Sequence, residues 1–308
     1  MTGDTAAATS PGALSAADVA AAVQLACLLE ASAPKPGNVS PGRHFPDARY
    51  EDFLASAAAI GEPLAGAGTR PVGATVRLAV EATSRWTRSN TNLGVILLLA
   101  PLARAVGDIV GANSDTALRD ALRRVLEATS VDDARDVYTA IRRAAPGGLG
   151  RATEQDVKDD PTMTLLDVMR LAADRDGVAR EYATAFETTF GIGAPALDRA
   201  RRDGLAWNDA VVETFLTLLA ARPDTHIARR GGAARAEDAS RLARSALAAG
   251  GVRSAGGRRA IDDMDRGLRD ARHIGNPGTT ADLTAAAIFV VLVGGGWQTQ
   301  GGRDAAIR

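Results

Sequence analysis

The chain has almost no cysteine. Cys27 is the single cysteine among 308 residues, so neither an internal disulfide nor a cysteine-based zinc site is available. It lies among Val23, Leu25, Leu28 and Leu29, and we interpret it as a small core residue rather than a nucleophile. A single thiol is consistent with a reducing compartment, and we expect the protein to be cytoplasmic.

An excess of basic residues is also absent. The 36 lysines and arginines are balanced by 37 aspartates and glutamates. Nucleic acids and anionic membranes favour proteins with a basic patch, so neither partner is indicated. The most apolar run, Leu283 to Val293, is too short to cross a bilayer. Residues 1–13 lack the features of a secretory signal and are predicted to be a disordered tail.

Strand patterns are nearly absent, alanine is abundant, and aromatic residues make up 4% of the chain. The sequence therefore predicts an all-α fold: a single compact domain of roughly ten to twelve helices over residues 14–294, followed by a frayed tail over 295–308. Serine or threonine precedes several of the amphipathic segments, as is typical of helix starts. The predicted helices cover residues 15–31, 50–60, 72–86, 93–100, 114–127, 130–144, 164–190, 209–221, 234–249, 258–272 and 280–293.

The usual signatures of catalysis are missing. The chain contains no G-x-x-x-x-G-K-[ST], no G-x-G-x-x-G, no H-E-x-x-H and no G-x-S-x-G. What it does contain is a set of four polar loops with glycine or proline at helix junctions. They are Pro34 to His44, Ser89 to Gly94, Asp224 to Gly232, and Asn276 to Asp282.

The loop from Pro34 to His44 has three prolines and two glycines in eleven residues, which makes it stiff and excludes a helix. It also carries Lys35, Asn38 and Arg43, with backbone N–H groups near Gly37. Cations and free N–H donors on a rigid loop could hold a phosphate. From these residues alone, an ordinary basic surface connection is an equal alternative.

The other three loops have alternative readings as well. Asn90, Asn92, Thr279 and Thr280 could simply cap the helices that follow them, or could present helix N-termini to an anion. Arg229 and Arg230 could form a phosphate fork or could be cations at a helix C-terminus. Capping accounts less well for Asp282, because a charge in the first turn of an apolar helix needs a partner.

Several carboxylates elsewhere are candidates for metal binding or proton transfer. Asp167, Asp174 and Glu181 are spaced by seven and would share one face of a single long helix, although such a face is more often solvated. Asp176 also interrupts the apolar pattern there, and Glu81 lies within an alanine- and valine-rich helix. Three acidic residues near the C-terminal end are interpreted as a solvated face: Asp262, Asp263 and Asp265.

Taken in order, the four loops resemble those of the triphosphoribosyl-dephospho-CoA synthases. No single motif is specific, but the ordered set extends from about residue 20 to residue 293. The matching segments are Pro34-Lys35-Pro36-Gly37-Asn38-Val39, Asn90-Thr91 with Gly94, Arg229-Arg230-Gly231-Gly232, and Pro277-Gly278-Thr279-Thr280-Ala281-Asp282-Leu283.

The resemblance implies an all-α transferase of cofactor biosynthesis, which makes the precursor of the citrate lyase and malonate decarboxylase prosthetic group. ATP would be the ribosyl donor. The 2′-hydroxyl of dephospho-CoA would attack the anomeric carbon of the ATP ribose, adenine would leave, and the triphosphate would be retained. The expected partners are small molecules, with Mg²⁺ accompanying ATP, and no tightly bound organic cofactor is expected.

Such a reaction passes through an oxocarbenium-like transition state and needs cations, a base and a proton donor. Metal ligands and the oligomeric state are not assigned. The roles of the other residues are suggested by this chemistry rather than by the resemblance. Phosphates are assigned to Lys35, Arg43, Arg229 and Arg230; ribose or base to Asn38, Asn90 and Asn92; further substrate contacts to Gly37, Thr279 and Thr280; and base or metal ligand to Asp282, Glu81 or Asp174.

Two departures from the family pattern affect the choice of substrate. The family usually reads Asn-Thr-His-Lys-Gly where this chain has Asn90-Thr91-Asn92-Leu93-Gly94, so a titratable group and a cation are both replaced. The fourth loop of this chain begins with Asn276, where the family usually has a serine. A related enzyme with another nucleotide or acceptor is therefore an alternative, and a non-catalytic helical binding protein is a second. If the protein is an enzyme, the four loops should converge on one cavity.

Overall fold

The computed structural model describes residues 14–109, 114–270 and 272–297. In these residues the chain is helical, and the one β-type contact is an isolated bridge between Ser40 and Arg43. The helices are α1 (Ala16–Ser32), α2 (Tyr50–Ala59), α3 (Gly61–Ala65), η1 (Gly66–Thr69), α4 (Val72–Thr83), α5 (Leu93–Gly107), α6 (Asp115–Glu127), α7 (Val131–Ala144), α8 (Leu165–Ala172), α9 (Gly177–Ala183), η2 (Thr189–Gly193), α10 (Ala194–Arg202), α11 (Trp207–Ala221), α12 (Thr225–Gly231), α13 (Ala233–Ala248), η3 (Gly251–Arg253), α14 (Ala255–Leu268) and α15 (Gly278–Val293).

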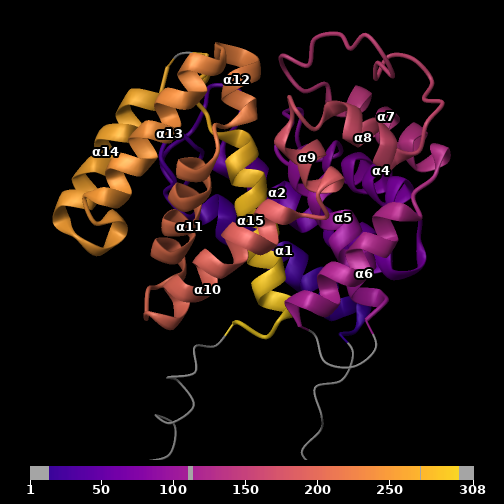
Figure 1. Ribbon diagram of the computed structural model, residues 1–308, viewed down its shortest axis with the longest axis horizontal. Helices are drawn as coiled ribbons and strands as arrows, with labels where there is room; N and C mark the ends of the chain where they lie inside the picture. The colour runs from indigo at the N-terminus through magenta and orange to yellow at the C-terminus, as the bar shows by residue number, and fades with distance from the viewer. Residues whose placement is uncertain (1–13, 110–113, 271, 298–308) are drawn as a thin grey trace, which may run out of the picture.

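The centre of the fold is formed by α5 and α15, whose sequences are apolar on every side. Both are buried along nearly their whole length. In Figure 1, α15 and α1 lie between one group formed by α10, α11, α13 and α14 and another formed by α4 to α9. Helix α15 contacts α1, α5 and α11, so it joins the two groups through one hydrophobic core.

The all-α, single-domain prediction is confirmed, although the helices are more numerous than the ten to twelve expected. None of the helices in the described part of the chain is long and apolar enough to cross a membrane. Val293 ends α15, and residues 295–297 follow it as a turn. The predicted tail over residues 1–13, and the part of the predicted C-terminal tail that begins at residue 298, lie outside the described residues.

The predicted long helix over residues 164–190 is wrong. It is divided into α8 and α9 because Asp176 turns its carboxylate onto the backbone N–H groups of Val178 and Ala179 and starts a new helix. Ala185 and Phe186 then adopt positive φ angles of 48° and 57°, which ends α9 before the π-helical turn η2. Amphipathic periodicity does not reveal either break.

Several other helix limits also differ from the prediction. Residues 223–232, predicted as a loop, contain α12, because the Asp224 side chain caps it through the N–H of Ile227. Helix α5 continues through Pro101 to Gly107, and α14 ends at Leu268 rather than at residue 272. The region of residues 61–68, predicted as a break, forms α3 and part of η1.

Candidate active site

The four polar loops converge on one cavity of about 820 Å³. This convergence is expected of an enzyme. The volume of the cavity lies within the range of pockets that bind small molecules. Each loop contributes residues to the lining: Asn38 from the first; Asn90, Asn92 and Gly94 from the second; His226, Arg229 and Arg230 from the third; and Asn276, Thr279 and Asp282 from the fourth.

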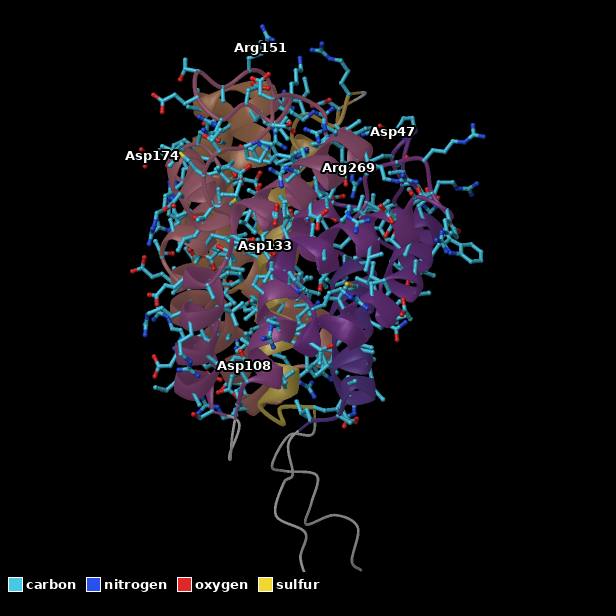
Figure 2. The ribbon with its side chains drawn as sticks, turned by 90° about the vertical axis from the view of Figure 1, so that its right-hand side faces the viewer. Asp47, Asp108, Asp133, Arg151, Asp174 and Arg269 are labelled. Carbon is cyan, nitrogen blue, oxygen red and sulfur yellow. The ribbon has the colours of Figure 1, made fainter. Side chains whose placement is uncertain are left out.

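A fifth wall of the cavity comes from the long connection between α7 and α8, which the sequence presented only as a charged loop. In Figure 1 this connection lies at the same end of the molecule as α12, and Figure 2 labels Arg151 at that end. Tyr138 of α7 donates a hydrogen bond of 2.5 Å to the carbonyl oxygen of Gln155, and Asp156 accepts from the N–H groups of Ala152 and Lys158. The connection is therefore held in place by its own contacts.

Asp282 is the most distinctive residue of the cavity. Its carboxylate forms no hydrogen bond or ion pair with any described residue, although it lines the cavity in the first turns of α15. It lies against the start of α5, where a Cβ on Gly94 would be 2.0 Å from Oδ2. Burial, followed by the neighbouring carboxylates Glu30, Asp224 and Asp176, raises the pKa of Asp282 well above its usual range. The group can therefore hold a proton at a pH where exposed aspartates have lost theirs.

Two further carboxylates line the cavity beside Asp282. Glu30, at the end of α1, forms an ion pair of 2.9 Å with Lys35. Asp176, besides capping α9, lies 3.3 Å from a guanidinium nitrogen of Arg229. The sequence drew attention to Asp174 and Asp176 together, but only Asp176 reaches the cavity because its capping geometry turns it toward α12.

Among the described residues, six arginines line the cavity together with five carboxylates. Among its arginines, Arg88, Arg151 and Arg175 form no ion pair with a described side chain, so they are available to an anionic ligand. Arg230 donates to the carbonyl oxygens of Arg272 and His273. The complete set of arginines is Arg88, Arg143, Arg151, Arg175, Arg229 and Arg230. The sequence pattern indicates only Arg229 and Arg230 as phosphate ligands, because the other four come from separate segments.

A chain of polar contacts connects the first, third and fourth loops. Nδ2 of Asn38 donates to the side-chain oxygen of Asn276 at 3.0 Å, and the carbonyl oxygen of Asn276 lies 2.9 Å from Nδ1 of His226. Next to it, Phe45 and His273 are stacked with ring centroids 4.0 Å apart, and both line the cavity. The wall here offers amide, imidazole and aromatic groups, which suit a nucleoside base or sugar.

The first loop does not present its cations to the cavity, contrary to the sequence-based assignment. Lys35 is completely buried; it forms an ion pair with Glu30 and donates a hydrogen bond to the carbonyl oxygen of Ala33. Arg43 pairs with Asp265 at 3.1 Å, and the N–H of Gly37 donates to the same carboxylate at 2.7 Å. These partners occupy Lys35, Arg43 and Gly37 internally, so of the residues assigned to this loop only Asn38 lines the cavity.

Asp265 is correspondingly not part of a solvated face. Its side chain is buried and receives bonds from Gly37, Arg43 and Arg269, so it fastens the first loop to α14. Gly37 has a φ of 75°, and a Cβ there would be 2.9 Å from Leu268. Glycine is needed at this position to bring the loop against α14.

Two of the three proposed catalytic carboxylates do not line the cavity. Glu81 pairs with Arg77 on α4, and Asp174 is exposed at the periphery of the molecule, as Figure 2 shows. The face shared by Asp167, Asp174 and Glu181 does not exist, because the helix is broken at residues 173–176. Glu181 is instead buried and accepts from Thr188 and Thr189. These placements remove Glu81 and Asp174 from the candidate site.

The remaining predicted residues divide between ligand-facing and structural positions. The Asn90 side chain accepts from the N–H of Leu93, as a cap would, and Asn92 donates to Thr83 at 3.3 Å. Thr280 donates to the buried carboxylate of Asp224 and does not line the cavity. Thr279 does line it, although its hydroxyl also contacts that of Thr225. No group of three or more potential metal ligands occurs in the described parts of the chain.

Comparisons of the sequence and of the structure with known proteins indicate the same family. The sequence model of a family described as ATP:dephospho-CoA triphosphoribosyl transferase matches residues 16–300. A Pseudomonas aeruginosa (strain UCBPP-PA14) protein named as a probable 2-(5''-triphosphoribosyl)-3'-dephosphocoenzyme-A synthase is 38% identical over 128 residues. That match covers 39% of this chain and 42% of the relative, so the chain spans about two fifths of the relative's length.

A Pseudomonas putida protein with the same name is 30% identical over 188 residues, covering 60% of this chain and 64% of the relative. Among solved structures, a candidate triphosphoribosyl-dephospho-CoA synthase from Archaeoglobus fulgidus is similar with a TM-score of 0.61 and 27% sequence identity. The similarity covers 80% of this chain and 100% of that one.

Proposed function

The chain belongs to the ATP:dephospho-CoA triphosphoribosyl transferase family, and on that premise we propose that it transfers the triphosphoribosyl group of ATP to the 2′-hydroxyl of dephospho-CoA with release of adenine. The observation that carries the proposal is the unpartnered Asp282 carboxyl in a cavity lined by arginines. A proton donor in a cavity with arginines that can bind phosphate is what the departure of adenine from a polyphosphorylated ribose requires.

The arginines account for the binding of two highly anionic substrates in one cavity. Arg175 precedes α9 and Arg229 lies in α12, whereas Arg88 and Arg143 come from the segment after α4 and from the end of α7. Guanidinium groups bind phosphate oxygens in bidentate fashion and remain charged at all relevant pH values. Holding the triphosphate on one side leaves the anomeric carbon free to meet the acceptor hydroxyl.

In this mechanism the glycosidic bond between the ribose and adenine breaks through an oxocarbenium-like transition state. Asp282 donates a proton to the departing adenine, which would otherwise leave as a poor, anionic leaving group. Its raised pKa supports that assignment, because the protonated form persists to higher pH than in an exposed aspartate. Glu30 and Asp176 contribute negative charge close to Asp282, which favours the protonated form and would stabilise positive charge developing on the ribose.

ATP would enter as its Mg²⁺ complex. We also propose that the protein acts in the cytoplasm, where ATP is available, and that its partners are small molecules rather than nucleic acids.

A second candidate, a different nucleotide or acceptor, is favoured by the cavity wall at the second loop. Asn92 and Leu93 stand where the related family pattern has a histidine and a lysine, and both line the cavity. Leucine cannot bind phosphate, and the Asn92 amide already contacts Thr83. The loss of a cation at this point would weaken binding of an acceptor phosphate and favour a substrate with an uncharged group there.

The test is a direct assay of adenine release. Purified protein is incubated with Mg²⁺, ATP and dephospho-CoA; adenine is quantified by chromatography, and the triphosphoribosyl product is identified by mass. Asp282→Asn should lower the rate by about 10²–10⁴-fold. The matched control, Asp263→Asn, changes an exposed aspartate on α14 and should leave the rate unchanged.

Absence of both adenine and product would refute the proposed reaction. The same protein is then examined by thermal shift with other nucleotides and phosphorylated acceptors, since a ligand of the native state raises its melting temperature. Stabilisation by one of these, together with adenine or another base released from it, would identify the second candidate. A binding protein without catalytic function would show stabilisation and no turnover.

A further inference from the structure

His226 lies in the first turn of α12 and lines the cavity. Its Nδ1 is 2.9 Å from the backbone carbonyl oxygen of Asn276. A carbonyl oxygen only accepts hydrogen bonds, so Nδ1 carries the proton and donates it. The neutral ring is therefore fixed in the tautomer whose Nε2 has a free lone pair, and no described residue forms a hydrogen bond with Nε2.

The orientation of this ring is set by its surroundings. Gly278 packs against it so closely that a Cβ would lie 3.1 Å from Nδ1. Asn276, which receives the Nδ1 proton, is held by the amide of Asn38, and the carbonyl oxygen of Asn38 accepts from Arg269 at 2.6 Å. The imidazole is thus placed by a succession of contacts that ends at Arg269, directly after α14.

Burial, more than the neighbouring charges, favours the neutral form of this ring. Burial lowers the pKa of His226, while the hydrogen bond to Asn276 and the carboxylate of Asp224 act in the opposite direction. Arg229 and Arg230, on the same helix, lower it further. Of the helices packed on α12, α15 contributes Asp282 to the cavity, and Arg235 of α13 is paired with Asp270. A neutral imidazole with a free nitrogen is able to accept a proton.

We propose that Nε2 of His226 is the base that removes the proton from the attacking hydroxyl of the acceptor. The inference rests on the transfer reaction proposed above and adds a second proton-transfer group to it. The acceptor oxygen forms a bond with the anomeric carbon of the ribose as its proton passes to Nε2. The bond from that carbon to adenine breaks, the electron pair leaves with adenine, and adenine takes the proton of Asp282. The imidazolium then returns a proton to Asp282, directly or through water, which restores both groups.

The experiment compares the wild-type protein with His226→Asn, whose side-chain amide can still donate to the carbonyl of Asn276 but has no nitrogen that titrates. Adenine release is measured from pH 5 to 9 as kcat/KM for dephospho-CoA at saturating Mg²⁺ and ATP. The wild-type profile should fall on the acidic side with the pKa of a histidine. In His226→Asn the rate should be about 10²–10⁴-fold lower and that acidic fall should vanish. His44→Asn, at an exposed histidine outside the cavity lining, is the control.

A purely structural role makes the opposite prediction. His226→Asn keeps the orienting hydrogen bond, so it would then retain most of the activity and would still lose rate on the acidic side of the pH profile. Retained activity, or a retained acidic fall, would overturn the inference. His226→Ala provides a further comparison, since added imidazole should restore part of its rate in the pH range where imidazole is neutral. If the wild-type protein releases no adenine with dephospho-CoA, the transfer reaction fails first and the role of His226 fails with it.

The wild-type protein also offers a test that needs no substitution at His226. It has three histidines, so their imidazole resonances can be followed by NMR titration and assigned with His44→Asn and His273→Asn. The pKa of His226 should coincide with the pKa of the acidic fall in kcat/KM. A His226 that titrates elsewhere would refute the proposed base even if both His226 variants fail to fold.

Discussion

Gly94 allows the Asp282 carboxyl to lie against the start of α5, and Gly94→Ala tests that contact. An alanine Cβ would lie 2.0 Å from Oδ2 and 2.5 Å from Cγ of Asp282, whereas ordinary contact begins at 3.4 Å. Inserting a methyl group into a packed site costs about 1–3 kcal/mol. Alanine favours the helical state over glycine by about 0.5–1 kcal/mol. We therefore expect a net loss of roughly 0.5–2 kcal/mol of unfolding free energy from these two effects.

The contact predicts a specific dependence on Asp282. With Asp282→Ala in place, the clash is removed and Gly94→Ala should stabilise the protein by about 0.5–1 kcal/mol. The two backgrounds therefore differ by about 1–3 kcal/mol, a coupling within the range measured for residues in contact. The assay is thermal unfolding of the wild type, both single variants and the double variant, with roughly 2 °C expected for each kcal/mol in a large domain.

Gly267→Ala is the matched control, because Gly267 lies in α14 with open space around its Cβ position. It should stabilise the protein by the same amount in both backgrounds. An equal effect of Gly94→Ala with and without the Asp282 carboxyl would refute the close approach of α15 to the start of α5. Catalysis provides a second readout, since the displaced carboxyl in Gly94→Ala should also lower the rate of adenine release.

Three further predictions follow from buried charges. The raised pKa means that Asp282 keeps its proton in the native state at a pH where the unfolded chain has lost it, so this carboxyl lowers the free energy of unfolding as the pH rises. In thermal unfolding at pH 8, Asp282→Asn should therefore melt at a higher temperature than the wild type. The difference between the two melting temperatures should narrow toward pH 4. Asp265→Ala leaves the N–H of Gly37 without its buried acceptor and should cost about 1–3 kcal/mol in chemical denaturation, while an unchanged midpoint would mean that the first loop is held by other contacts. Lys35→Met leaves the Glu30 charge uncompensated and should cost about 3–5 kcal/mol of stability. If Lys35→Met instead folds normally and only raises KM for ATP, Lys35 binds phosphate and its buried pairing is incorrect.

The helical architecture was largely predictable because its signals are local. Ser15 and Ser130 begin helices with capping boxes, as their spacing to Asp18 and Asp133 indicates. Breaks within helical composition were less predictable. The capping carboxylate of Asp176 divides a segment whose apolar periodicity continues on both sides, so the pattern alone favoured one long helix.

The candidate site was predictable as a set of loops but not as a set of contacts. Asp282 stood out because a charged residue at the start of an apolar helix is unusual, and it does line the cavity. Lys35 and Arg43 stood out for their charge, but their partners Glu30 and Asp265 come from elements that the sequence does not place beside them. The sequence therefore predicts a solvated Asp265, and the pairing that buries it is visible only in the fold.

The sequence by itself determined most of the helices, their polar junctions and the presence of an acidic residue at the start of α15, since these depend on neighbours along the chain. Only the tertiary structure decided which charges face the cavity and which neutralise one another. That choice depends on contacts between residues far apart in the chain, such as Gly37 with Asp265 and Gly94 with Asp282. Burial then sets the protonation of Asp282 and His226, because the cost of a charge depends on the surroundings that the folded chain provides.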